Sequence, residues 1–234
     1  PSRMAEVLNR VIEKAFRGSA PAQINVPRDY WTQVIDIELP PIVRFERQGG
    51  GKEAIENAAK LLSKAKFPVI LSGAGVVLGG AIDECKKLAE KLDAPVCNGY
   101  QHNDSFPGSH PLAVGPLGYN GSKAAMELIS KADVVLALGT RLNPFSTLPG
   151  YGIDYWPKKA TIIQVDMNPD RIGLTKKVSV GICGDAKQVA QQILDKLSSD
   201  AGNTGREERK NLIHKTKSAW LQTLSGLDHE EDDP

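Results

Sequence analysis

The sequence is poor in the features that mark secreted, membrane-spanning or nucleic-acid-binding proteins. Its three cysteines, Cys85, Cys97 and Cys183, lie far apart and form no Cys-x-x-Cys. This spacing excludes a fully paired disulfide framework and a structural zinc site, and it predicts reduced thiols in the cytoplasm. No apolar run approaches the roughly 20 residues of a membrane-spanning helix. The net charge is only +1, so we expect no electrostatic attraction to nucleic acid or to an anionic membrane.

A recognisable catalytic constellation is also missing. The four histidines, His102, His110, His214 and His229, have no metal-ligand spacing. No serine or cysteine lies in a nucleophile elbow, and no pair of carboxylates follows a strand in the way that acid–base chemistry requires. We therefore predict neither a catalytic residue nor a metal ligand in this chain.

Changes in composition divide the chain into four predicted parts. They are residues 1–29, the end of a preceding domain; 30–51, a linker rich in Pro, Gly and charge; 52–200, the main domain; and 201–234, a connector. The first part has a helical pattern over 3–17 and a strand pattern over 22–26. The last part has a helical pattern over 207–224, with no sheet of its own to pack on, and an acidic run over 228–234 that is typical of a solvated connector.

Short apolar runs alternate with helical patterns in the main domain. Each run ends abruptly in glycine or polar residues, as strands buried on both faces of a parallel sheet do. The predicted strands are 67–72, 94–97, 133–138, 160–165 and 178–182. The predicted helices are 52–65, 80–92, 121–131 and 185–198, and the long loops are 98–120 and 141–158. This alternation predicts an α/β fold with a doubly wound, mostly parallel sheet flanked by helices.

Polar residues follow two of these strands. Gly139 and Arg141 come after 133–138, and Asp166 ends the next run, just before Asn168. Ligands bind outside the carboxyl ends of parallel strands, so these residues predict a ligand edge. Arg141 is suited to clamp a phosphate or carboxylate, or to pair with a neighbouring loop. Asp166 is suited to accept from ribose hydroxyls, or to cap the turn that follows it.

Two glycine-rich segments add candidate phosphate contacts. Gly73-Ala-Gly75 follows the first predicted strand, but Gly79 comes one residue late for the dinucleotide-binding pattern G-x-G-x-x-G. The segment is either a tight turn of small residues or a phosphate-cradling turn of different geometry. Gly118 and Gly121 precede Ser122, which can cap the next helix and leave N–H groups for a phosphate, or simply close an ordinary loop.

Five segments in order resemble the thiamine diphosphate (ThDP) enzymes related to acetolactate synthase. They are Pro21-Ala-Gln-Ile-Asn-Val-Pro-Arg-Asp29, Pro68-Val-Ile-Leu-Ser-Gly-Ala-Gly75, Gly115-Pro-Leu-Gly-Tyr-Asn-Gly121, Val134-Val-Leu-Ala-Leu-Gly-Thr-Arg141 and Ile163-Gln-Val-Asp-Met-Asn-Pro169. The resemblance implies a Rossmann-like central domain, preceded by the tail of a pyrimidine-binding domain. Two further segments, 147–157 and 215–221, resemble the sulfoacetaldehyde acetyltransferases within this family.

The narrower resemblance implies a reaction for a longer protein. In it the ThDP carbanion adds to sulfoacetaldehyde, sulfite leaves, and phosphate takes the acetyl group as acetyl phosphate, with magnesium anchoring the cofactor diphosphate. The family's activating glutamate and its Gly-Asp-Gly…Asn magnesium motif belong to other domains, and this chain contains neither. We therefore expect this chain to be a fragment that is inactive by itself, with the ThDP and Mg²⁺ sites elsewhere.

The resemblance also implies a nucleotide site in the central domain. The positions that match the family's contacts are Gly75, Gly118, Gly121, Ser122, Gly139, Arg141, Asp166, Asn168 and Asp185. In members of the family this domain carries FAD, holds an adenine nucleotide or stays empty, so an adenine nucleotide is one possible ligand. Asn120 stands where flavin-binding relatives often have histidine, which argues against FAD. The resemblance implies a homo-oligomer, a dimer or a tetramer. A stand-alone nucleotide-binding module, a nicotinamide-dependent enzyme and another acetolactate synthase-like enzyme remain alternatives.

Overall fold

The computed structural model describes residues 1–18, 20–41 and 46–227. The chain divides into two compact units, Pro1–Arg47 and Gln48–Pro234. The predicted linker over 30–51 spans this division. The acidic run at the end of the sequence lies outside the described residues.

The first unit has little secondary structure. It contains helix α1 (Met4–Gly18), on which no residue is buried, and the 3₁₀ turn η1 (Arg28–Thr32). The helix predicted over 3–17 is confirmed, but the strand predicted over 22–26 is wrong, because these residues pair with no strand. An alternating apolar segment becomes a strand only where a neighbouring strand accepts its hydrogen bonds.

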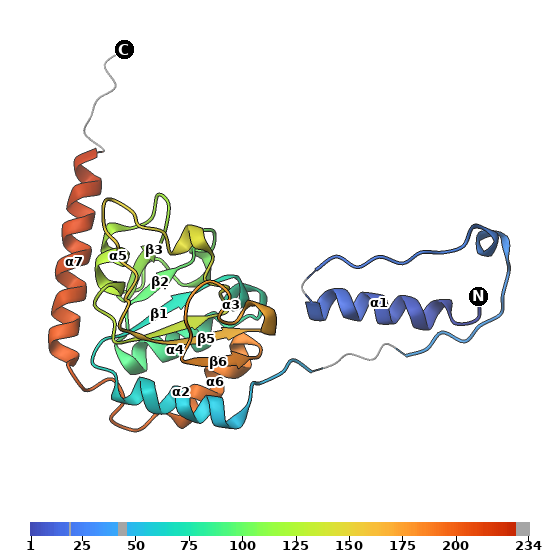
Figure 1. The fold of residues 1–234 in the computed structure, drawn as a ribbon, viewed down its shortest axis with the longest axis horizontal. Coiled ribbons are helices and arrows are strands. Elements are labelled where there is room, and N and C mark those ends of the chain that lie inside the picture. Colours follow the sequence, from blue (N-terminus) through green and yellow to red (C-terminus); the bar gives the residue numbers. More distant parts are fainter. Residues whose placement is uncertain (19, 42–45, 228–234) are drawn as a thin grey trace, which may run out of the picture. The chain divides into compact units, whose positions relative to one another are not determined.

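The second unit is a single sheet with helices on both faces (Figure 1). Its strands are β1 (Pro68–Ser72), β2 (Val96–Asn98), β3 (Ala113–Pro116), β4 (Val134–Leu138), β5 (Thr161–Asp166) and β6 (Val180–Cys183). Its helices are α2 (Lys52–Lys64), α3 (Ala74–Leu78), α4 (Ile82–Leu92), α5 (Lys123–Ile129), α6 (Ala186–Lys196) and α7 (Arg206–Leu227), with short 3₁₀ turns η2 (Asn103–Ser105), η3 (Pro144–Ser146) and η4 (Pro169–Arg171).

The sheet confirms the predicted fold class. Its strand order is β3-β2-β1-β4-β5-β6, and every neighbouring pair is parallel. The chain moves outward from β1 to β3 and then returns to add β4 on the other side of β1. The strand order therefore reverses between β1 and β4, the switch point at which doubly wound sheets form their ligand crevice.

The central strands β1 and β4 are buried throughout because each face of the sheet carries its own apolar cluster. Neighbouring side chains on β4 illustrate this: Leu136 packs with α2, α4 and α6, whereas Val135 and Ala137 pack with α5. Alternate residues of a strand point to opposite faces. A run such as Val134–Leu138 is therefore apolar throughout rather than alternating.

One local prediction in this unit was wrong in part, and one helix was not predicted. The predicted loop over 98–120 contains the edge strand β3, and the turn at Gly73–Gly75 already opens the five-residue helix α3 before α4. β3 reads Ala-Val-Gly-Pro, a composition that favours turns, and it becomes a strand only because β2 pairs with it.

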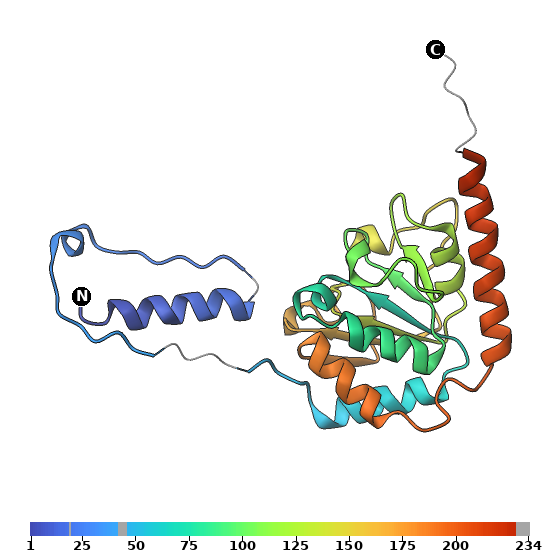
Figure 2. The same ribbon diagram turned by 180° about the vertical axis from the view of Figure 1, so that it is seen from behind.

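The helix predicted over 207–224 is present as α7, but it has a packing partner. It lies along the face of the domain that carries α5 (Figures 1 and 2), and Ile213 belongs to the apolar cluster on that face. None of the helices in the described part of the chain has the length and apolar character that crossing a membrane demands.

The switch point is closed by direct contact between backbone atoms. Gly75 N–H donates to the Gly139 carbonyl at 2.8 Å, and Gly73 N–H donates to the Leu138 carbonyl at 3.1 Å. A Cβ on Gly75 would lie 2.7 Å from Gly139 Cα, and one on Gly139, whose φ is +60°, would lie 2.7 Å from Val76 N. Only glycine on both sides permits the ends of β1 and β4 to approach this closely.

Gly139→Ala tests the importance of this contact, with Gly80→Ala as the matched control. Gly80 has nearly the same φ, +63°, but a Cβ there would meet nothing within 4 Å. We expect Gly80→Ala to lower the free energy of unfolding by about 1–2 kcal/mol through backbone strain alone. Gly139→Ala should lower it by about 1–3 kcal/mol more, because it also pushes two backbones apart. Urea unfolding measures both, and equal losses would show that the close approach is unimportant.

Candidate functional site

All nine predicted contact residues lie at one edge of the sheet. They follow or end the strands as Gly75 after β1; Gly118, Gly121 and Ser122 after β3; Gly139 and Arg141 after β4; Asp166 and Asn168 at the end of β5; and Asp185 after β6. Parallel pairing places the carboxyl ends of all six strands together. We call this region the carboxyl edge.

The glycines after β3 are used in packing within this edge. Gly118 has a φ of +93°, and a Cβ there would collide with the Phe145 carbonyl oxygen. A Cβ on Gly121 would lie 2.6 Å from the Pro116 carbonyl oxygen. Because Tyr119 N–H also donates to Phe145 O, the two long loops of the domain rest directly on each other. Gly118 therefore permits the close approach of the two loops, and Gly121 permits the turn after β3 to fold tightly on itself.

Three of the polar candidates cap the elements that they precede. Ser122 Oγ accepts from Ala125 N–H at 3.2 Å, and Asn168 Oδ1 accepts from Asp170 N–H at 3.0 Å. Asp185, which is only 2% exposed, accepts through Oδ1 from two N–H groups in the first turn of α6. These amide groups are the ones that a bound phosphate would use. The caps explain the sequence preference at these positions without a ligand.

Asp166 is buried and serves a turn. Its Oδ1 accepts from Asn168 N–H at 2.8 Å, and its carbonyl accepts from Gly184 N–H at 3.0 Å. Asp166 therefore caps the turn that follows β5, which is one of the two roles predicted for it. A hydrogen bond to a ribose hydroxyl remains a prediction.

Arg141 differs from the other candidates because its side chain is exposed. Its guanidinium makes no hydrogen bond or ion pair with any residue that the structure describes. The backbone beneath it is well fixed: Thr175 Oγ1 donates to Leu142 O at 2.7 Å, and Leu142 has a left-handed φ of +54°. Such strained backbone is held in place only by its surroundings. Arg141 thus presents a free cation from a rigid support.

Gln164 is a residue that the strand pattern did not single out. It is 1% exposed in the middle of β5, and its Nε2 donates to both Thr140 O and Arg171 O at 3.1 Å. Its Oε1 accepts from Gly173 N–H at 2.9 Å. These bonds tie the loop after β5 to the loop after β4. An amide side chain inside an otherwise apolar strand could have predicted this role, since buried polar groups need hydrogen-bond partners.

A second buried polar group lies under the ends of β1 and β2. Ser72 Oγ and Ser105 Oγ are 2.6 Å apart, and Asn98 Nδ2 donates to Ser105 Oγ at 2.9 Å. Ser105 also donates to His102 O, which fixes the loop that follows β2. The hydroxyls and the amide thus satisfy one another, and no described residue hydrogen-bonds to either serine as a base.

The cysteines and histidines that the structure describes do not form a reactive or metal-binding group. Cys85 and Cys97 are unpaired and buried, and burial raises the pKa of the Cys85 thiol to about 12, which keeps it protonated. His110 Nε2 lies 3.2 Å from Glu90 Oε1, and its ring packs edge-on against Phe106. Among the described residues, no three His, Cys, Asp or Glu side chains lie close enough together to hold a metal ion.

Comparison with known proteins identifies the domain. Residues 55–193 match the family model described as thiamine pyrophosphate enzyme, central domain. A solved benzoylformate decarboxylase from Polynucleobacter necessarius superposes with a TM-score of 0.72 at 22% identity, over 88% of this chain and 38% of that one. At that level of identity the superposition shows a shared fold.

Curated relatives align with the whole chain. A probable sulfoacetaldehyde acetyltransferase from Rhizobium meliloti (strain 1021) is 79% identical over 100% of this chain and 40% of the relative. The sulfoacetaldehyde acetyltransferase of Roseovarius nubinhibens is 77% identical over 100% of this chain and 39% of the relative. A probable acetolactate synthase large subunit from Methanocaldococcus jannaschii is 34% identical over 97% and 37%.

This chain therefore spans about two-fifths of the length of these relatives. Its six parallel strands, its carboxyl edge and the family match over 55–193 agree with one another. The chain belongs to the thiamine pyrophosphate enzyme family and contains that family's central domain.

Proposed function

We propose that this chain is the central part of a longer ThDP-dependent enzyme that converts sulfoacetaldehyde and phosphate into acetyl phosphate and sulfite. The observation that carries the proposal is a contrast in identity. Five relatives named for this activity share 50–79% of the aligned residues, whereas an acetolactate synthase relative shares 34%. The segments 147–157 and 215–221 support the same choice by their resemblance to sulfoacetaldehyde acetyltransferases.

The proposed reaction balances without an external oxidant or reductant. The carbon–sulfur bond breaks and its electron pair leaves with sulfite. The aldehyde carbon is oxidised to the acyl level, the neighbouring carbon is reduced to a methyl group, and a phosphate oxygen forms the new bond to the acyl carbon. ThDP supplies the carbanion chemistry when it is bound.

We assign ThDP and Mg²⁺ to other parts of the longer polypeptide. The carboxylates of the carboxyl edge do not suit a metal site, because Asp166 and Asp185 already hold backbone N–H groups. No step of the reaction is assigned to this chain. Its proposed role is to hold the other domains in place, in a cytoplasmic homo-oligomer. The exposed apolar side chains of α1, Val7, Leu8, Ile12 and Phe16, are consistent with such an assembly.

The activity is tested with the full-length protein that contains this chain. Supplied with ThDP, Mg²⁺, sulfoacetaldehyde and phosphate, it should release sulfite and acetyl phosphate in equal amounts. Pyruvate serves as the control substrate, and the 234-residue chain alone should yield neither product. Formation of acetolactate from pyruvate, without sulfite release from sulfoacetaldehyde, would assign the protein to the acetolactate synthase branch instead.

We further propose that the carboxyl edge binds an adenine nucleotide through its diphosphate. The supporting observation is Arg141, whose exposed guanidinium makes no hydrogen bond or ion pair with the described residues. The N–H of Gly75 is already used by Gly139, so the proposed contact depends on the arginine more than on the glycine turn. FAD is disfavoured by Asn120, and a purified preparation should be colourless.

ADP binding is measured by the melting temperature of the chain. Millimolar ADP should raise it, because a ligand that binds only the folded state stabilises that state. Arg141→Met should abolish the shift, while Arg10→Met, which removes an exposed arginine of α1, should leave it unchanged. If ADP does not change the melting temperature, the carboxyl edge does not bind the nucleotide and the proposal fails.

A further inference from the structure

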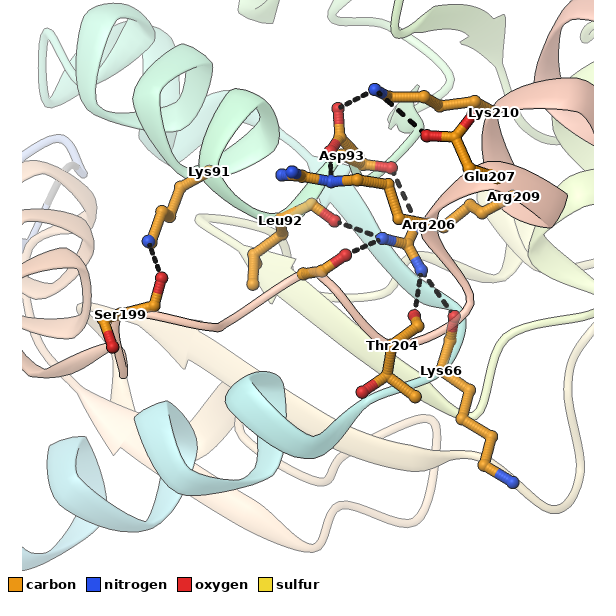
Figure 3. Close-up of polar contacts among 11 residues, drawn as sticks. Lys66, Lys91, Leu92, Asp93, Ser199, Thr204, Arg206, Glu207, Arg209 and Lys210 are labelled. Atoms are coloured by element: carbon orange, nitrogen blue, oxygen red, sulfur yellow. Dashed lines mark hydrogen bonds and ion pairs between the residues drawn. The ribbon is translucent and has the colours of Figure 1, made fainter.

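The most completely buried charge in the second unit lies at the opposite end of the sheet from the candidate site. Arg209 of α7 is 1% exposed, yet each nitrogen of its guanidinium donates to main-chain carbonyl groups (Figure 3). The five acceptors are the carbonyls of Asp93, Lys66, Thr204, Leu92 and Gly202. An arginine has five N–H donors in a planar fork, so the site uses its full donor capacity. We call Arg209 and these carbonyls the latch.

The latch joins three separate segments at the amino ends of the strands. Lys66 lies between α2 and β1, Leu92 and Asp93 lie at the end of α4, and Gly202 and Thr204 belong to the turn before α7. The carbonyls at the end of α4 have no partner within their own helix, and a cation is favoured there by the helix dipole. One side chain therefore completes α4 and fixes the start of α7.

Neighbouring charges support the latch without replacing it. The Arg206 guanidinium forms an ion pair with Asp93, and Lys210 Nζ lies 4.0 Å from the other oxygen of that carboxylate (Figure 3). Burial lowers the pKa of Arg209, and the charge of Asp93 opposes this shift. Because arginine is not deprotonated in proteins, the guanidinium keeps its charge and all its donors.

Apart from this latch, α7 has a narrow contact with the domain. The buried residues on its described part are Arg209, Ile213 and Thr216, spaced along a single stripe. Ile213 is the one aliphatic side chain among them, at 4% exposed, and the partly buried Leu212 packs against the same apolar cluster. A stripe of this width buries little apolar surface compared with the two-sided burial of the strands. The docking of α7 therefore relies on a polar contact to an unusual degree.

The far end of α7 reaches the carboxyl edge. Trp220 packs against the ring of Tyr151 at 5.9 Å, and the Tyr151 hydroxyl donates to Gly121 O at 3.1 Å. Between Arg209 and Trp220 the helix rises about 16 Å, at 1.5 Å per residue. Between them, Lys217 Nζ donates to Pro111 O at 2.8 Å. The helix thus connects the latch to a loop that carries candidate contact residues.

A cavity beside the latch gives water access to it. It has a volume of about 620 Å³ and is lined by Lys66, Phe67, the segment 204–209 and Leu212. When α7 moves away, water from this side can solvate the released carbonyls, which reduces the cost of leaving them unpaired. Opening of α7 therefore does not require the sheet to unfold.

From these observations we propose that α7 is a strap held by the Arg209 latch, which opens as a unit while the sheet stays folded. The strap positions the Tyr151 loop against Gly121 when it is closed, and it releases that loop when it is open. Arg209 is a positioning residue in this account, because it acts on the carboxyl edge through α7.

Hydrogen exchange of the 234-residue chain, read by mass spectrometry, tests the strap. Arg209→Met and Arg209→Lys should each speed exchange over 209–224 by about tenfold or more, because a lysine has only three N–H donors and no fork. Amides of β1, β4 and β5 should keep their wild-type protection. Lys215→Met removes an exposed charge from the same helix and should change neither region.

Two results would overturn the proposal. If α7 in Arg209→Met stays as protected as in the wild type, the guanidinium is not a latch. If the strands lose protection together with α7, the helix does not open separately. Should the variants fail to fold, hydrogen exchange of the wild-type chain in low urea provides the test. We expect the exchange of α7 to depend less on urea than the exchange of β4, because the opening of α7 exposes less surface. Equal urea dependence would mean that both exchange through one shared opening, and it would refute the strap.

Discussion

The contact between Gly75 and Gly139 sets the geometry on which the rest of the domain depends. Two backbones meet where the strand order reverses, and a hydrogen bond of 2.8 Å joins them. The ends of β1 and β4 are thereby fixed relative to each other. The loops after β1, β2, β4 and β5 start from these strands or from their direct neighbours, and the loops after β3 and β6 start one strand further out. Any residue other than glycine at these two positions would push the strand ends apart and move the loops that start from them.

The carboxyl edge is largely satisfied by its own hydrogen bonds. Ser122, Asp185 and Asp166 all bind backbone N–H groups, and Gln164 joins two loops from inside the sheet. Groups that are paired in this way rigidify the edge, since each would be costly to leave unpaired. Such an edge suits a domain whose main role is to support the rest of a larger enzyme. Arg141 is the exception among the predicted contacts, and it is where a ligand would find an unused charge.

The helix α7 is also held mainly by polar contacts. A connector that is fixed by apolar burial would share the stability of the core. Here a buried guanidinium and a narrow stripe do most of the fixing, so the helix has its own, lower stability. The amino end of the sheet, where α7 begins, and the carboxyl edge, where Trp220 meets Tyr151, are thereby joined through one element.

The sequence by itself determined the alternation of strands and helices, the doubly wound class and the edge at which the candidate residues lie. Those features follow from local apolar periodicity and from residues that stop it, such as Gly139 after Val134–Leu138. Only the tertiary structure decided that Ala113–Pro116 is a strand, that Gly75 contacts Gly139, and that Arg209 is buried. Each of these depends on partners far away in the chain. An arginine in a charged helix looks exposed until the carbonyls of two distant segments and of the turn before α7 converge on it.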